Sequence, residues 1–153
     1  GGGTGILGLI KADAELRGLG LVEGPPPRFV VVQAEGCAPL VRAHGEGKSQ
    51  ADPWSDPRTT ASGLRVPGTI GDHVILDGLR RTGGTAIAVS DGEMAEAQVW
   101  AGRDEGLFLA PEAAATVAAA HRLVRSGWLD PREEVLLLLT GNGFKYPQAE
   151  RVA

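Results

Sequence analysis

Short apolar runs alternate along the chain with longer segments in which apolar and polar residues repeat at helical spacing. The run at 29–33 (FVVVQ) is rich in β-branched residues, which predicts a strand that is buried on both faces, and the run at 85–89 (TAIAV) predicts a second strand. The run at 134–139 (EVLLLL) predicts a further buried strand, and residues 107–109 predict a brief extended piece. These runs supply the strands of a single sheet.

Helical spacing and capping signals predict the segments between the strands. Pro111 stands at the first turn of an alanine-rich segment, and the run Ser90-Asp91-Gly92-Glu93 matches a capping box. The predicted helices span 6–17, 37–44 (beginning near Pro39 and ending at Gly45), 72–82, 94–103 and 111–126. Because strands alternate with helices, we predict an α/β fold with a mainly parallel twisted sheet and helices on both faces.

The stretch 47–68 shows neither the hydrophobic period of a helix nor that of a strand. It contains three prolines, Trp54 and the cations Arg58 and Arg65. A long stretch of this kind inside a domain is typical of a functional or a disordered loop.

Composition narrows the function classes. The chain has 15 Lys and Arg against 19 Asp and Glu, a net charge of −4, which argues against sequence-independent binding to nucleic acid. No apolar run approaches the roughly 20 residues that cross a bilayer, so no membrane association is expected. The single cysteine, Cys37, excludes an internal disulfide and fits a reducing compartment, which predicts a cytoplasmic protein. The three histidines lack metal-ligand spacing with each other or with Cys37, so no metal site is expected.

The first candidate for chemistry is the glycine-rich opening Gly1-Gly2-Gly3-Thr4-Gly5, which is followed directly by a predicted helix. Backbone N–H groups converge on anions at such places, and the helix N-terminus favours negative charge. The alternative is a tight turn that binds nothing. Since glycine loops of α/β proteins usually follow a strand, we expect this sequence to be a C-terminal piece of a longer protein.

Three further residues carry candidate chemistry. Thr140 follows the run 134–139 and precedes Gly141, so its neutral hydroxyl can hydrogen-bond a ring nitrogen without forcing a proton onto it; the alternative is a strand end with glycines for a tight turn. Arg65 suits a carboxylate or phosphate partner, although a single arginine is more often a solvated surface residue. Glu112 lies in the first turn of a predicted helix, where the dipole alone is sufficient reason for a carboxylate.

Together these stretches resemble the C-terminal half of the threonine synthases, in the fold-type-II superfamily of pyridoxal-phosphate (PLP) enzymes that also contains the tryptophan synthase β chain. The matching stretches are GGGTGILGLIKADAEL, VVVQAEGCAPLVRA, TTASGLRVPGTIGDHVILDGLRRTGGTAIAVSD, LAPEAAATVAAAHRL and TGNGFKYP. They stand in family order and cover the chain from Gly1 to Pro147.

The resemblance implies a fold and a cofactor site. Residues 1–153 would be the larger, PLP-binding C-terminal lobe of the enzyme. The backbone of the glycine loop (Gly1, Gly2, Gly3, Thr4 and Gly5) would hold the phosphate, and Thr140 would hydrogen-bond the pyridine nitrogen. Ser62, Gly63 and Glu112 would lie near the edge of the ring, with Arg65 as a neighbour of the substrate.

The resemblance also implies a reaction. Threonine synthases convert O-phospho-L-homoserine and water to L-threonine and phosphate, and the full-length protein is expected to be a homodimer. Their Schiff-base lysine precedes the glycine loop, and neither Lys11, Lys48 nor Lys145 matches it, so we expect no catalytic residue here and no activity from this chain alone. The alternatives are a related serine or threonine dehydratase or β-replacement enzyme, and a non-catalytic ligand-binding module with the same fold.

Overall fold

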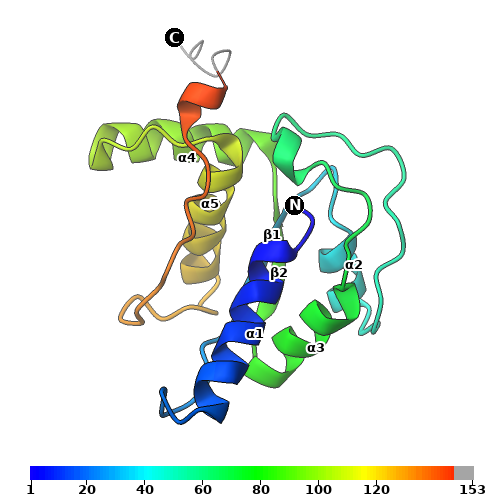
Figure 1. Ribbon diagram of the computed structural model, residues 1–153. Coiled ribbons are helices and arrows are strands. Elements are labelled where there is room, and N and C mark those ends of the chain that lie inside the picture. The colour runs from blue at the N-terminus through cyan, green and yellow to red at the C-terminus, as the bar shows by residue number, and fades with distance from the viewer. Residues whose placement is uncertain (147–153) are drawn as a thin grey trace.

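Two parallel strands form the centre of the structure, a computed structural model that describes residues 1–146 (Figure 1). Val30 of β1 pairs with Thr85 of β2, and the register continues to the pair Ala34 and Val89. In chain order the elements are α1 (Thr4–Gly18), β1 (Val30–Ala34), α2 (Pro39–Gly45), η1 (Ser62–Leu64), α3 (Asp72–Thr82), β2 (Thr85–Val89), α4 (Asp91–Glu105), α5 (Pro111–Arg125) and η2 (Gly143–Lys145).

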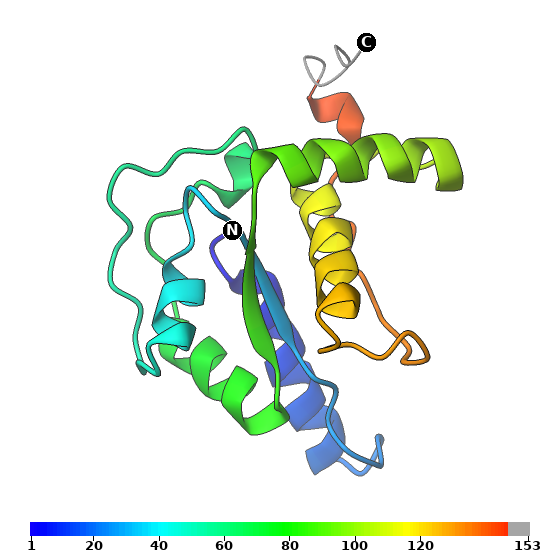
Figure 2. The same ribbon diagram turned by 180° about the vertical axis from the view of Figure 1, so that it is seen from behind.

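Helices cover both faces of the strand pair, as predicted (Figure 2). Alternate residues of a strand point to opposite faces. Val31 therefore belongs to a core with α2 and α3, against which the start of α1 packs, whereas Val32 packs on a second core formed with α4 and α5. The α/β class with a parallel sheet is confirmed.

Local sequence signals explain where two of the helices begin. At α4 the Ser90 hydroxyl accepts a hydrogen bond from Glu93 N at 3.2 Å, and the Glu93 carboxylate accepts one from Ser90 N at 2.8 Å. This is the predicted capping box. At α1 the residue before the helix is Gly3, whose φ of 86° lies in the left-handed region that favours glycine.

The strand predicted at 134–139 is wrong. The segment is extended but forms no strand within the described residues, and its leucines are largely exposed, with Leu136 at 83%. In both views it runs beside α5, which lies between this segment and β1 and β2, so its backbone cannot reach the sheet. Pairing occurs farther on, as an isolated antiparallel bridge between Leu109 and Asn142.

The stretch predicted to be irregular, 47–68, contains no α-helix or strand, but residues 62–64 form η1 and the loop before it is fixed at several points. Arg58 N donates to Gly36 O at 3.0 Å, and Thr59 Oγ1 donates to Asp91 Oδ1 at 2.6 Å. A Cβ on Gly36 would lie 1.7 Å from Arg58 O, so only glycine permits this approach. The loop thereby leads to η1 at a defined place beside the start of α4.

Candidate functional site

The glycine loop ends at the N-terminus of α1, where backbone donors are free. The first hydrogen bond of the helix runs from Leu7 N to Gly3 O at 3.0 Å. The amides of Thr4, Gly5 and Ile6 therefore have no partner within the helix. No atom lies within 4 Å of the position that a Cβ on Gly5 would take, so a ligand can approach this backbone closely.

The same loop packs tightly on its other side. A Cβ on Gly1 would lie 2.5 Å from Gly63 O, and one on Gly3 would lie 2.6 Å from Ile75 Cδ1. These contacts fix the loop against η1 and α3. A hollow of about 190 Å³ adjoins it, lined by Gly1, Gly3, Gly5, Ile6, Val30, Val31, Val32, Gln33 and Leu40. The N-terminus of α1 thus has one open side.

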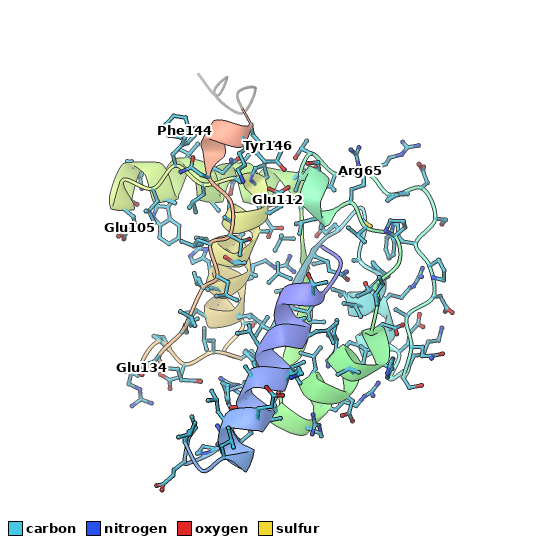
Figure 3. The ribbon with its side chains drawn as sticks, in the orientation of Figure 1. Arg65, Glu105, Glu112, Glu134, Phe144 and Tyr146 are labelled. Carbon is cyan, nitrogen blue, oxygen red and sulfur yellow. The ribbon has the colours of Figure 1, made fainter. Side chains whose placement is uncertain are left out.

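A hydrogen-bonded cluster around the carboxylate of Glu112 joins η1 to α5 (Figure 3). Oε1 of Glu112 accepts a hydrogen bond from Gly63 N at 2.7 Å and a second from the hydroxyl of Tyr146. The Tyr146 hydroxyl also lies 2.8 Å from Ser62 Oγ. A Cβ on Gly63 would meet Glu112 Oε1 at 2.8 Å, so a larger residue there would displace the Glu112 side chain.

The cluster changes the acidity of the phenol. Partial burial and the hydrogen bond to Glu112 raise the pKa of Tyr146 above its ordinary value, although the hydrogen bond with Ser62 acts in the opposite direction. A phenol with a raised pKa stays protonated at neutral pH and remains a hydrogen-bond donor to the carboxylate.

The turn that contains Thr140 reaches the same end of α5. Ala110 N, just before α5, donates to Gly141 O at 3.1 Å, and a Cβ on Gly141 would lie 2.7 Å from the Cβ of Ala110. Thr140 itself is exposed and its N–H donates to Leu138 O at 3.0 Å. Among residues 1–146, no hydrogen bond links Thr140 to the glycine loop.

Arg65 and the three lysines lie on the surface. Arg65 follows η1 with an exposed side chain, and its N–H donates to Ser62 O at 3.2 Å. Lys11 forms an ion pair with Glu15 on α1. Lys48 pairs with Glu46 at 2.7 Å and with Asp52 at 2.8 Å. Lys145 is exposed at the end of η2.

The predicted residues therefore fall into three groups. Gly1 and Glu112 both contact Gly63 directly, and Ser62 is linked to Glu112 through the Tyr146 hydroxyl. The Thr140 turn meets the same end of α5 and, within residues 1–146, forms no hydrogen bond with the glycine loop, and Arg65 extends from the neighbouring turn into solvent. Sequence reasoning missed Tyr146, whose only signal was its place at the end of the TGNGFKYP stretch; Pro147 of that stretch lies outside the described residues.

Two classes of site find no support in the described part of the chain. Residues 1–146 contain no group of three or more His, Cys, Asp or Glu side chains that could hold a metal ion. None of the described helices is long and apolar enough to cross a membrane.

Residues 1–141 match the protein family described as "Pyridoxal-phosphate dependent enzyme". The chain is 33% identical to the threonine synthase of Methanocaldococcus jannaschii over 80% of this chain and 30% of that protein. It is also 33% identical to the threonine synthase of Methanosarcina acetivorans, over 97% of this chain and 36% of that protein. It is 31% identical to the cysteate synthase of Methanospirillum hungatei, over 94% of this chain and 36% of that protein.

Among solved structures, the crystal structure of a threonine deaminase from T.th. superposes with a TM-score of 0.50 and 23% identity, over 65% of this chain and 30% of that one. At this identity the likeness concerns the fold. The chain spans about a third of the length of the curated relatives that it matches.

Proposed function

Since the chain belongs to the family of pyridoxal-phosphate dependent enzymes, whose cofactor is pyridoxal phosphate, we propose that residues 1–153 form the cofactor-binding lobe of a lyase of this family. The observation that carries the proposal is the group of free amides at the N-terminus of α1, open on one side at Gly5 and packed on the other against Gly63.

The residues present fit such a cofactor. A phosphate needs converging N–H donors and a positive dipole end, and Thr4, Gly5 and Ile6 offer both. The absence of a side chain at Gly5 leaves the room that the phosphate oxygens need. A polar ring needs hydrogen-bonding groups at a short distance beyond the phosphate, and the cluster of Ser62 and Glu112 adjoins the glycine loop through Gly63.

Each group has a distinct task in this proposal. The amides of the glycine loop, Gly1 to Gly5, bind and orient the phosphate. Glu112, held by Gly63, offers an acceptor near the edge of the ring. When bound, the cofactor supplies an electron sink for a carbanion on the substrate. Thr140 is the proposed partner of the ring nitrogen, and its turn already contacts Ala110 at the start of α5.

We propose O-phospho-L-homoserine as the substrate of the full-length protein, with L-threonine and phosphate as products. The threonine synthases at 30–33% identity support this choice. Arg65, whose side chain is exposed beside η1, is the cation that this chain offers to a phosphorylated substrate. We propose that the Schiff-base lysine comes from elsewhere in the full-length protein, since Lys11 and Lys48 are paired with carboxylates on the surface. The similarity to a cysteate synthase supports a second candidate, a β-replacement enzyme of the same family.

A matched pair of substitutions on α1 tests cofactor binding. Gly5→Asp places a carboxylate among the free amides, whereas Gly8→Asp places the same group one turn farther along, and neither position has an atom within 4 Å of the new Cβ. We expect Gly5→Asp to weaken the binding of PLP at least tenfold in equilibrium dialysis, because it repels the phosphate, and Gly8→Asp to have little effect. Equal affinities of the two variants would contradict the phosphate site.

The substrate is tested separately. Full-length protein loaded with PLP should release inorganic phosphate from O-phospho-L-homoserine and should not deaminate L-serine or L-threonine. Deamination of L-serine or L-threonine without phosphate release would instead support a dehydratase, and turnover of a different phosphorylated amino acid would support a β-replacement enzyme.

A further inference from the structure

Tyr146 lies where three segments distant in the sequence meet, and we propose that it is a positioning residue for Glu112. In this proposal its hydroxyl and the Gly63 amide hold one carboxylate oxygen, so that the other is kept for a ligand that carries a hydroxyl or a protonated nitrogen. This inference rests on the proposed function, because the ligand in question is the one whose phosphate lies at the glycine loop.

The hydrogen bonds at Glu112 are unevenly distributed. Oε1 receives both of them, from Gly63 N and from the Tyr146 hydroxyl. Within residues 1–146, Oε2 receives none. An ionised carboxylate accepts about four hydrogen bonds over its two oxygens, so Oε2 retains its capacity to accept. Gly63 also touches Gly1, which places the cluster next to the glycine loop where the ligand would bind.

The direction of the hydrogen bonds follows from the protons available. A phenol has one proton, and the carboxylate of Glu112 can only accept, so Tyr146 donates to Glu112. Ser62 must then donate to the phenol oxygen, from which its Oγ lies at 2.8 Å. Because Ser62 donates to the phenol oxygen, the phenol proton points toward Glu112.

The two donors come from separate segments of the chain and meet at one carboxylate oxygen. Gly63 belongs to η1, Tyr146 follows η2, and Glu112 lies on the first turn of α5 (Figure 3). One hydrogen bond leaves a glutamate side chain free to rotate about it. Two donors from separate segments restrict that rotation, which is the preorganisation that a binding group needs.

The test compares two probes on the full 153-residue chain. Equilibrium dialysis measures the affinity for PLP, which would contact Glu112, and for inorganic phosphate, which would contact the glycine loop alone. We expect Tyr146→Phe to weaken PLP binding about three- to tenfold, as for the loss of one ordinary hydrogen bond, and to leave phosphate binding unchanged. Ser62→Ala should also weaken PLP binding, but less than Tyr146→Phe does.

Two controls separate positioning from a merely structural role. Thr116→Val deletes a hydroxyl on the same helix that bonds only to Ala113 O, at 2.8 Å, and should change neither affinity. Tyr146 is the only tyrosine, so phenolate absorbance reports its ionisation alone, and Glu112→Gln should shift that ionisation to lower pH.

The outcomes are distinct. If the wild-type chain binds PLP but Tyr146→Phe binds it equally well, or loses PLP and phosphate affinity to the same extent, the positioning role is wrong while the proposed function stands. If the wild-type chain binds neither probe, the proposed function is wrong and the inference fails with it.

Discussion

The hydroxyl of Tyr146 donates a hydrogen bond to Glu112 across 34 positions of the sequence, and this contact ties the end of the described chain to the start of α5. The same phenol oxygen accepts a hydrogen bond from Ser62, 84 positions away. The two contacts have opposite effects on the phenol, because Glu112 disfavours the phenolate and Ser62 stabilises it. Each can therefore be measured separately.

Ser62→Ala should raise the pKa of Tyr146 further above its ordinary value, because it removes the donor that stabilises the phenolate. The measurement is phenolate absorbance against pH, compared with the wild-type chain. A phenol whose pKa is raised by folding stabilises the fold below its unfolded pKa, and this stability is lost as the pH rises through the folded value. Unfolding by urea should accordingly show a steeper alkaline loss of stability in the variant. A shift of the titration to lower pH would contradict the contact.

Gly36→Ala should destabilise the fold by about 2–4 kcal/mol, because the new Cβ would lie 1.7 Å from Arg58 O and the loop would have to move. Urea unfolding monitored by circular dichroism measures the loss. Gly18→Ala is the matched control. Gly18 is the last residue of α1, and a Cβ there would have no atom within 4 Å, so the substitution should be neutral or stabilise the fold by up to about 1 kcal/mol. Similar unfolding free energies for the two variants would show that the loop does not approach residue 36.

Local signals made much of this fold predictable. The capping box at Ser90, the first-turn prolines Pro39 and Pro111, and the β-branched runs at 29–33 and 85–89 each indicate an element that the structure contains. In each case the residues that cause the element lie within it or beside it. Interactions between residues close in the sequence are therefore sufficient to predict these elements. The predicted helices differ from the observed ones by a few residues at their ends.

Ser90→Ala should cost about 1 kcal/mol at neutral pH, because it leaves the amide of Glu93 without its cap. Burial raises the pKa of Glu93, but the hydrogen bonds from Ser90 and the charge of Arg122 outweigh it, so the pKa lies below its ordinary value. A carboxylate with a lowered pKa stabilises the fold above its unfolded pKa and loses that contribution as the pH falls through the folded value. The difference between wild type and variant should therefore shrink in acid.

Urea unfolding at neutral and acidic pH measures this difference. Ser49→Ala, an exposed serine outside the helices, is the control and should stay within about 0.5 kcal/mol of the wild type at both pH values. If Ser90→Ala loses the same unfolding free energy at both pH values, the hydroxyl of Ser90 stabilises the helix through the amide of Glu93 alone and not through its carboxylate.

The candidate site was less predictable than the fold. Glu112 and Gly63 belong to sequence stretches that already suggested chemistry, but nothing near Tyr146 in the sequence indicates that it reaches them. Contacts across dozens of residues depend on how α5 and η2 pack, which no local pattern encodes. Thr140 was placed on a strand end because of its apolar run, and that premise is wrong, so its link to the ring nitrogen stays a prediction.

The failed strand at 134–139 has a physical consequence. An apolar run predicts burial, but burial as a strand also needs a neighbour with free backbone groups, and α5 separates this segment from the sheet. The result is an exposed apolar stretch, with Val135 at 48% and Leu136 at 83% exposure. Extended apolar segments with unpaired backbone are sites of self-association.

Leu136→Lys should therefore reduce self-association of the chain without lowering its free energy of unfolding, because a side chain this exposed contributes little to the core. Static light scattering over a range of protein concentrations measures the first effect, and urea unfolding measures the second. Gln50→Lys adds the same charge at an exposed polar position and controls for net charge alone. If Leu136→Lys instead unfolds the protein, the leucine is buried and the segment packs against the fold; if both variants reduce scattering equally, charge repulsion rather than the apolar segment governs association.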